Sequence, residues 1–447
     1  MQKNKLNNYL KHKINSKEAL ITVIGAGYVG LPLAIAFASS GFNVLNIDND
    51  QYKVDKINSG ESYIGDIPSS VLKSLSPVSN TAGSLSATTE YSAISGADVV
   101  IICVPTPVSK TKDPDLSYIV SATQSISEYI HENMLIILES TTYPGTTEEL
   151  IVPILENVHD GAFKVGDNIN VAFSPERIDP SNQEWTVMDT PKVIGGITES
   201  CSEISALLYS SAIQTIVPVS STKVAEMVKL LENTYRATNI GLVNEIAIMC
   251  DHLNIDVWEV IDAAATKPFG FTPFYPGPGL GGHCIPVDPQ FLAWKLKTLN
   301  YNARFIQLAT EINSSMPAYV VSKTMDILNN QNKSLNGSNI LVLGIAYKPN
   351  VSDFRESPSL DIIDLLQQKG ALVSYNDPLI PLLNFEHFNM ASLELTVPIL
   401  KTFDCIIIAT HHSDYDWGWI CQNSNAILDT RNATGFLKKQ YNNVVKL

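Results

Sequence analysis

The segment GGHCIPVD, residues 281–288, places Cys284 in a loop dense in glycine and proline. Backbone packs closely around a side chain in such a loop, which suits a positioned nucleophile that bonds covalently to its substrate. The alternative is a buried structural cysteine, which is the commoner fate of this residue type. These residues alone leave both interpretations open.

Lys229, Asn233 and Arg236 are spaced at i, i+4 and i+7, so a helix would place all three on one face. The pattern predicts this helix from Thr222 to about Leu253, and its length could bridge two domains. A solvated face is the alternative. Asparagine has poor propensity in mid-helix, however, which favours a specific hydrogen-bonding role for Asn233.

A glycine fingerprint, Gly25-x-Gly27-x-x-Gly30, follows a β-rich run over 19–24 and opens a predicted helix over 31–40. In a dinucleotide-binding fold the first two glycines allow a tight turn and close backbone approach. The third lets the helix pack on the strand, and the helix N-terminus faces the pyrophosphate. A turn without a ligand is the alternative, but the strand and helix on either side favour a cofactor site.

Asp48 ends the second predicted strand, 42–47, eighteen residues after Gly30. An acid at this position accepts hydrogen bonds from the adenosine ribose and repels a 2′-phosphate, which favours NAD over NADP. Lys53 follows five residues later and would either contact the ribose or point into solvent.

Two further polar clusters follow predicted buried strands. ESTTYPG, residues 139–145, follows the strand 135–138, and SPERIDP, residues 174–180, follows the strand 171–173. Residues at the carboxyl ends of strands face the cofactor in a dinucleotide-binding fold, although turn chemistry alone would explain either cluster.

Strands that alternate with helices must position these residues. The first set of predicted strands lies at 19–24, 42–47, 98–104, 135–138 and 171–173. The alternation restarts near Asn339, with strands at 340–343, 372–375, 404–409 and 426–428 and a helix at 359–368. This predicts an α/β fold with two Rossmann-like doubly wound β/α domains, joined by a long central helix and a helical middle domain. The expected boundaries are a polar extension over 1–19 and domains over 20–218, 219–325 and 326–447.

The composition limits the function classes. The 447 residues are 45% hydrophobic and 17% charged, which excludes wholesale disorder. A formal charge of −15 disfavours nucleic acid and anionic membrane lipid as partners. The six cysteines form no CxxC pair, so neither a disulfide framework nor a metal site is expected. The Lys-rich N-terminus lacks the apolar run of a secretory signal, so a soluble cytoplasmic protein is expected.

Together these segments resemble the UDP-glucose/GDP-mannose dehydrogenase family from about Leu20 to Arg431. SPERID, AEMVKLLENTYRATNIGLVNEIA and FTPFYPGPGLGGHCIPVDP are most similar to its UDP-N-acetylhexosamine branch. The resemblance implies NAD-dependent, four-electron oxidation of the C6 alcohol of a nucleotide sugar to a carboxylate. UDP-N-acetylglucosamine is the expected substrate, with UDP-N-acetylmannosamine or UDP-N-acetylgalactosamine as alternatives.

Three departures from the glucose enzymes disfavour UDP-glucose. Those enzymes usually have a lysine where this chain has Val287, a second glutamate where it has Pro180, and an aromatic residue where it has Arg177. Two other classes are a non-catalytic nucleotide-sugar or NAD sensor and a two-electron 3-hydroxyacid dehydrogenase. A sensor would be expected to lose Cys284 or Lys229, and the hydroxyacid enzyme would not need Cys284.

The resemblance also implies residue roles. Cys284 would capture the aldehyde as a thiohemiacetal and then form a thioester. Lys229 would be the general base, through a water held by Thr141, and Asn233 would stabilise charge on oxygen. The implied catalytic residues are Cys284, Lys229, Asn233, Asp288, Thr141 and Glu176. Which of the two acids in that set activates the hydrolytic water is left open.

The implied ligand contacts extend over both β/α domains. Those for NAD are Gly25, Gly27, Tyr28, Val29, Gly30, Asp48, Lys53, Thr106, Thr141 and Arg355. Those for the UDP-sugar are Arg177, Ile178, Lys229, Asn233, Arg236, Gly279, Tyr347, Lys348 and Arg431. A homodimer or higher homo-oligomer through the central helix, and a place in polysaccharide synthesis, are implied as well.

Overall fold

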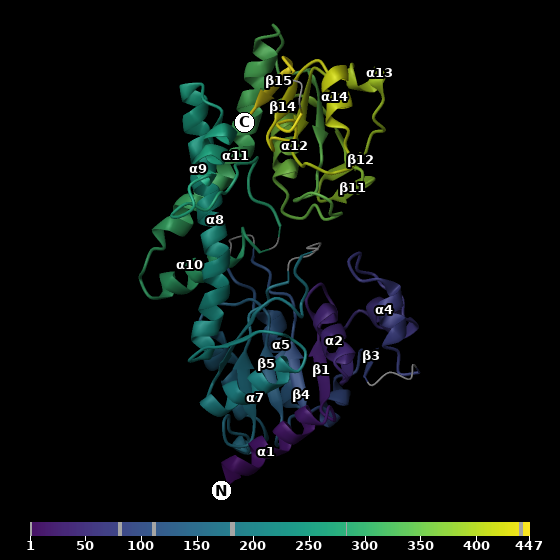
Figure 1. The fold of residues 1–447 in the computed structure, drawn as a ribbon, viewed down its shortest axis with the longest axis vertical. Coiled ribbons are helices and arrows are strands. Elements are labelled where there is room, and N and C mark those ends of the chain that lie inside the picture. The colour runs from purple at the N-terminus through teal and green to yellow at the C-terminus, as the bar shows by residue number, and fades with distance from the viewer. Residues whose placement is uncertain (1, 79–82, 110–112, 179–183, 283, 438–440) are drawn as a thin grey trace. The chain divides into compact units, whose positions relative to one another are not determined.

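The computed structural model describes residues 2–78, 83–109, 113–178, 184–282, 284–437 and 441–447 (Figure 1). Its contacts divide the chain into two compact units. The first unit contains the residues up to Glu232 together with Gln290–Asn300, and the second contains Asn233–Pro289 and Tyr301–Leu447. Each unit has its own β/α sheet.

The sheet of the first unit has eight strands in the order β3-β2-β1-β4-β5-β6-β7-β8. All neighbouring strands are parallel except β6 and β7. The order reverses between β1 and β4, and ligands bind at the carboxyl ends of strands at such a reversal. The strands are β1 Leu20–Ile24, β2 Asn43–Ile47, β3 Ser84–Thr88, β4 Val99–Ile102, β5 Leu135–Leu138, β6 Asn170–Phe173, β7 Lys192–Gly196 and β8 Ile216–Pro218.

Both faces of this sheet are covered. In β4, Val99 and Ile101 pack into one apolar cluster, whereas Val100 and Ile102 pack into another. A strand buried on both faces requires a continuous apolar run, which is why DVVIICV forms it. The covering helices include α2 Gly30–Ser39, α3 Gln51–Ser59, α4 Ser69–Ser74, α5 Ser117–Ser127, α6 Val152–Glu156 and α7 Glu199–Ser210.

A further helix, α1 at Gln2–Asn15, lies in the segment expected to be a polar extension. Leu10 and Ile14 on α1 are fully buried, and Lys13 Nζ donates to Asp98 Oδ1 at 2.7 Å. The i, i+4 spacing of these two apolar residues was the available signal for the helix.

Helix α8, Thr222–Leu253, matches the predicted long helix. It begins in the first unit, and the division between the units falls after Glu232, within the helix. Helix α10, Asp288–Thr298, crosses the division as well. Among the described residues, no helix has the length and apolar character that crossing a bilayer would require.

The sheet of the second unit has five parallel strands in the order β10-β9-β13-β14-β15, beside a separate hairpin of β11 and β12. The strands are β9 Asn339–Leu343, β10 Leu372–Asn376, β11 Leu382–Phe385, β12 Phe388–Ala391, β13 Cys405–Ile408, β14 Ile427–Asp429 and β15 Val444–Lys446. The helices are α9 Val257–Ala265, α11 Arg304–Asn329, α12 Pro358–Gln368, α13 Val397–Leu400 and α14 Trp417–Asn423.

The predicted α/β fold class with two Rossmann-like sheets is confirmed. The strand predicted at 135–138 has those bounds, and the strand predicted at 404–409 spans Cys405–Ile408. The antiparallel β7 and the β11–β12 hairpin were not predicted, because short, partly polar strands lack the apolar run that identified the others.

Candidate active site

The glycine fingerprint forms a turn that excludes side chains at two of its three glycines. Gly25 has φ +99°, and a Cβ on it would lie 2.5 Å from the Cys103 carbonyl oxygen. A Cβ on Gly30 would lie 1.9 Å from the Gly25 carbonyl oxygen. At Gly27 no heavy atom lies within 4 Å of the Cβ position. Gly25 and Gly30 therefore allow the turn and helix to pack, whereas Gly27 faces open space, which fits close approach of a dinucleotide.

The other predicted cofactor contacts of the first unit surround this turn. Tyr28 is exposed and Val29 is partly buried, directly before α2 begins. Thr106 and Thr141 are partly buried in the loops after β4 and β5. Arg355 belongs to the second unit, where Nε and Nη2 donate to Asp353 at 2.9 and 2.7 Å.

Asp48 is bonded to the fingerprint turn itself. Its Oδ2 accepts the Ala26 N–H at 2.7 Å and a hydrogen bond from Lys53 Nζ at 3.0 Å. Its Oδ1 accepts the Asp50 N–H at 3.0 Å. Lys53 is therefore an ion-pair partner of Asp48, so its ammonium lies beside the acid expected to bind the ribose.

Lys229 and Glu176 form a buried ion pair in the first unit. Lys229 Nζ donates to Glu176 Oε2 at 2.9 Å and to the Glu176 backbone oxygen at 2.8 Å. The other carboxylate oxygen, Oε1, accepts the backbone N–H of Ile178. These contacts fix the direction of the lysine ammonium and bring together two of the predicted catalytic residues.

Glu226 joins the Thr141 loop to α8, one turn before Lys229. Its carboxylate accepts the N–H of Gly145 at 2.5 Å and both the N–H and the hydroxyl of Thr147, at 2.9 and 2.7 Å. Burial raises the pKa of Glu226 to about 7, against the lowering effect of these hydrogen bonds. Glu226 was not predicted, because its partners lie about 80 positions away along the chain.

Glu139 opens the ESTTYPG cluster, and its side chain is bound inside the first unit. Its Oε2 accepts a hydrogen bond from Lys192 Nζ at 2.8 Å, and Oε1 accepts one from the Tyr209 hydroxyl. Burial raises the pKa of Glu139, although Lys192 opposes this shift. The interpretation that the whole cluster faces the cofactor therefore does not extend to this acid.

Arg177, a predicted substrate contact, is bound within the first unit. Nη1 donates to the Pro191 carbonyl at 2.8 Å, and Nη2 donates to Glu232 at the end of that unit's part of α8. Residues 179 and 180 of the same cluster, and His283 beside the cysteine, lie outside the described residues.

In the second unit, Cys284 precedes α10 and is exposed, whereas the other five cysteines of the chain are buried. The Cys284 carbonyl accepts the Asp288 N–H at 2.8 Å. The Asp288 carboxylate accepts a hydrogen bond from Asn233 Nδ2, and both of these side chains are buried. The predicted asparagine, on α8, is therefore in direct contact with the predicted acid, which closes the turn that begins at the cysteine. Arg236 is exposed.

Buried amides hold the glycine-rich loop before the cysteine. Asn244 Oδ1 accepts the Gly277 N–H at 2.9 Å, and Asn244 Nδ2 donates to Asn313 Oδ1 at 2.8 Å. Asn313 Nδ2 donates to the Ala237 carbonyl at 3.0 Å. The loop is thereby bonded to α8 and, through Asn313, to α11. Neither asparagine was predicted.

The same loop packs against predicted substrate contacts. Gly279 has φ +137°, and a Cβ on it would lie 3.0 Å from Pro358. A Cβ on Gly282 would lie 2.8 Å from the Tyr347 ring. Arg431 Nε donates to the Ala409 carbonyl at 2.9 Å, and burial lowers the pKa of Arg431 to about 10. Lys348 Nζ lies 5.9 Å from the centroid of the adjacent tyrosine ring.

Comparison with known proteins identifies all three parts of the chain. Sequence profiles of the UDP-glucose/GDP-mannose dehydrogenase family match as its NAD binding domain over 19–213, its central domain over 223–315 and its UDP binding domain over 341–435.

Whole-length relatives agree. A UDP-N-acetyl-D-mannosamine dehydrogenase of Methanococcus vannielii is 36% identical, over 91% of this chain and 88% of that protein. A UDP-N-acetyl-D-glucosamine 6-dehydrogenase of Pseudomonas aeruginosa is 34% identical, over 89% and 92%. The solved structure of a UDP-D-ManNAc dehydrogenase from Pyrococcus horikoshii has a TM-score of 0.84 at 33% identity and covers 96% of this chain and 98% of that one. The chain therefore belongs to the UDP-glucose/GDP-mannose dehydrogenase family, as a nucleotide-sugar dehydrogenase with an NAD-binding domain and a UDP-binding domain.

Proposed function

We propose that this enzyme oxidises the C6 alcohol of a UDP-N-acetylhexosamine to the carboxylate, with Cys284 as the covalent nucleophile. The observation that supports this most directly is the exposure of Cys284, beside Asp288, while every other cysteine is buried. A thiol that must add to a substrate carbon has to be accessible, and a structural cysteine has no such need.

Different residues of the chain carry out different steps of the proposed reaction. Lys229, oriented by Glu176, acts in its neutral amine form and takes the proton of the C6 hydroxyl, either directly or through a water held by Thr141, to become the ammonium. Two NAD molecules, bound one after the other, would each accept one of the two hydrides that leave C6. The Cys284 thiolate adds to the aldehyde carbon to give a thiohemiacetal, which becomes a thioester after the second oxidation.

Hydrolysis completes the reaction. Water adds to the thioester carbon, the carbon–sulfur bond breaks, and the carboxylate and the thiol are released. Asn233 is proposed to donate to the oxygen on which negative charge develops. Asp288, which accepts a hydrogen bond from Asn233, is proposed with Glu176 as a group that orients the attacking water.

Two epimers are candidates for the sugar. The M. vannielii and P. horikoshii relatives named above are mannosamine enzymes, which makes UDP-N-acetylmannosamine the first substrate to test. UDP-N-acetylglucosamine, which sequence analysis favoured, is the second, because the P. aeruginosa relative has that name. These sugars differ only in the orientation of the acetamido group at C2.

A panel of UDP-sugars assayed with NAD tests both the four-electron reaction and the identity of the sugar. Two NADH per sugar are expected for the four-electron reaction, and the relative kcat/KM values identify the epimer. Cys284→Ser should form little or no acid, with Cys250→Ala, a buried cysteine of the same unit, as the matched control. Acid formation by Cys284→Ser at the wild-type rate would contradict the covalent mechanism.

We also propose a homo-oligomer formed through α8. Tyr235, Leu242, Met249 and Leu253 on this helix are exposed at spacings of seven, seven and four residues, which puts them on one stripe. Leu242→Glu is expected to shift the sedimentation coefficient to that of the monomer. An unchanged coefficient would exclude this stripe as the interface.

A further inference from the structure

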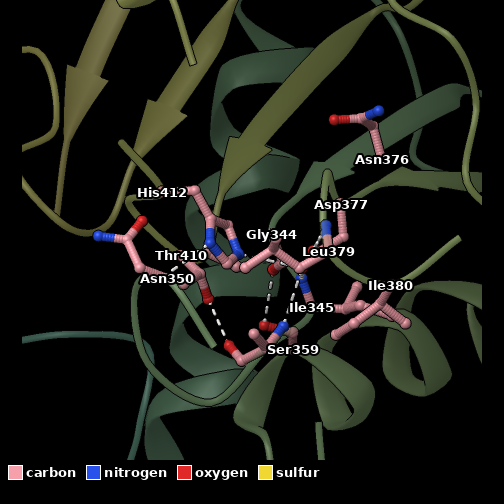
Figure 2. A network of polar contacts seen from close by, with 12 residues as sticks. Gly344, Ile345, Asn350, Ser359, Asn376, Asp377, Leu379, Ile380, Thr410 and His412 are labelled. Carbon is pink, nitrogen blue, oxygen red and sulfur yellow. Dashed lines mark hydrogen bonds and ion pairs between the residues drawn. The ribbon is translucent and has the colours of Figure 1, made fainter. Parts of the chain in front are cut away.

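The second unit contains a buried carboxylate and imidazole at the carboxyl end of its sheet (Figure 2). Asp377 follows β10 and His412 comes shortly after β13, and β9 lies between these strands. Both side chains are 0% exposed, and His412 Nε2 lies 3.1 Å from Asp377 Oδ2. No function was predicted for either residue.

The contacts of His412 determine its tautomer. Its Nδ1 accepts the backbone N–H of Asn350 at 3.0 Å, so this nitrogen has a lone pair and no proton. The proton of the neutral ring is therefore on Nε2 and is donated to Asp377. The pair is a neutral imidazole hydrogen-bonded to a carboxylate, with each ring nitrogen in a different role.

Asp377 is bonded to the start of the loop that contains Asn350. Its Oδ2 accepts the N–H groups of Ile345 at 2.8 Å and Ala346 at 3.1 Å, and its Oδ1 accepts that of Leu379 at 2.9 Å. Burial acts to raise the pKa of Asp377, but hydrogen bonds from His412 and the backbone outweigh burial and lower it. The acid is therefore a carboxylate at neutral pH.

Further hydrogen bonds hold the first part of this loop. Thr410 Oγ1 donates to the Ala346 carbonyl at 2.6 Å, and Ser359 Oγ donates to the Gly344 carbonyl at 3.1 Å. In Figure 2 the labelled side chains of Thr410, Ser359 and His412 converge on the backbone near Gly344.

The other end of the loop is held through Asn350. Its Nδ2 donates to Ser413 Oγ at 2.8 Å, and its Oδ1 accepts the Ser413 N–H at 2.9 Å. The loop 344–350 is thus bonded at both ends to the segment that follows β13. Tyr347 and Lys348 lie between those ends.

We infer that His412, together with Asp377, is a positioning residue for the UDP-sugar. It fixes the backbone of the 344–350 loop and so directs Tyr347 and Lys348 before the ligand arrives. A loop that is already ordered loses less conformational entropy on binding, so the affinity for the nucleotide is higher. This inference rests on the proposed contact of these two side chains with the UDP moiety.

The test uses the full-length protein and two probes, UDP alone and NADH alone, in titration calorimetry. His412→Ala should weaken UDP binding about tenfold, because it leaves buried polar groups without their partner, and should change NADH binding less than twofold. The KM for the UDP-sugar should rise with the UDP dissociation constant, while kcat changes less. His412→Asn, whose Oδ1 can accept the Asn350 N–H, should recover part of the affinity.

His387→Ala is the matched control. His387 also faces an aspartate in the second unit, with Nε2 3.2 Å from Asp364 Oδ1, but its side chain is 57% exposed. This variant should bind UDP as the wild type does. If His412→Ala does not fold, the comparison of His412→Asn with His387→Ala decides.

Two outcomes would overturn the inference: unchanged UDP affinity in a folded His412 variant, or equal losses for UDP and NADH. Tyr347→Ala and Lys348→Ala separate this failure from a failure of the proposed function. If these two variants weaken UDP binding and the His412 variants do not, only the positioning role is wrong. If all of them bind UDP normally, the proposed contact of the loop with UDP is wrong.

Discussion

In each sheet, a helix connects the first strand to the strand beside it. An aspartate directly follows that second strand. Asp48 follows β2 and accepts the N–H of Ala26, in the loop after β1. Asp377 follows β10 and accepts the N–H groups of Ile345 and Ala346, in the loop after β9. The two acids therefore have the same place in the two Rossmann-like folds and bind the same part of the neighbouring backbone.

The two acids differ in their remaining partners. Among the described residues, Asp48 accepts from three donors, one of which is Lys53 at the surface. Asp377 accepts from four, including the imidazole of His412. A carboxylate has about four lone-pair positions. Asp48 thus retains an acceptor position, as a ribose hydroxyl would need, whereas Asp377 has one donor more and its side chain is completely buried.

The loop after the neighbouring strand accounts for this difference. His412 lies four residues after the end of β13, and Thr106 lies four residues after the end of β4. Among the described residues, no hydrogen bond joins Thr106 to Asp48, and Thr106 is itself a predicted cofactor contact. The same position in the fold can therefore bind a ligand in one unit and support a loop in the other. The residue that follows a neighbouring strand decides between these two roles.

The largest expected effect is that of Asp377→Ala. The substitution leaves three buried donors, the N–H groups of Ile345 and Ala346 and the imidazole of His412, without an acceptor. We therefore expect the free energy of unfolding to fall by about 3–5 kcal/mol. Chemical denaturation and limited proteolysis should detect this loss. Asp364→Ala, which removes a partly exposed acid of the same unit, should change it little. A loss below about 1 kcal/mol would show that Asp377 is not structurally important.

Stability should depend on pH with opposite signs in the two units. The pKa of Glu226 is raised from its ordinary value of 4.5 to about 7. Between pH 4.5 and pH 7 the folded state therefore binds more protons than the unfolded state. Its contribution to stability therefore decreases as pH rises through that window, by about 3 kcal/mol at most. The pKa of Asp377 is lowered, so its contribution is present above the ordinary value of 3.8 and is lost as pH falls below it.

Glu226→Gln isolates the first of these effects. Denaturation curves between pH 5 and pH 8 should show that the glutamine variant gains stability relative to the wild type as pH rises. Parallel curves for the two proteins would mean that Glu226 does not titrate in this range.

Asp48→Ala should weaken NAD binding about tenfold, because a charged acceptor for the ribose is lost. Affinity for NADP relative to NAD should rise, since Lys53 would lose its partner and could attract a 2′-phosphate. Fluorescence titration with both reduced cofactors measures this, and UDP affinity serves as the internal reference. An Asp55→Ala control, on the exposed side of α3, should bind NADH normally.

The smallest effect is expected for Lys53→Met. Lys53 is 30% exposed, and a partly solvated ion pair contributes at most about 1 kcal/mol. NADH affinity should therefore change by a factor of about two to five. A larger loss would make Lys53 a cofactor contact in its own right and would weaken the contrast between the two acids.

The fold and the cofactor turn were predictable because their determinants are local. The fingerprint, Asp48 and Lys53 lie within thirty residues, and α8 follows from one uninterrupted pattern. Glu226, Asn244 and His412 were missed, because each acts through partners that lie dozens of residues away. A single sequence shows the polar residue itself but not the distant residue that it contacts. Lys53 is an intermediate case. It was predicted either to contact the ribose or to point into solvent, and only the structure shows its contact with Asp48.

The distribution of sulfur atoms has a practical consequence. Because Cys284 is exposed and the five other cysteines are buried, a small alkylating reagent should modify one thiol per folded chain. The stoichiometry of labelling would then count competent molecules in a preparation without any knowledge of the sugar. Slower alkylation in the presence of a candidate ligand would report occupancy before a turnover assay exists.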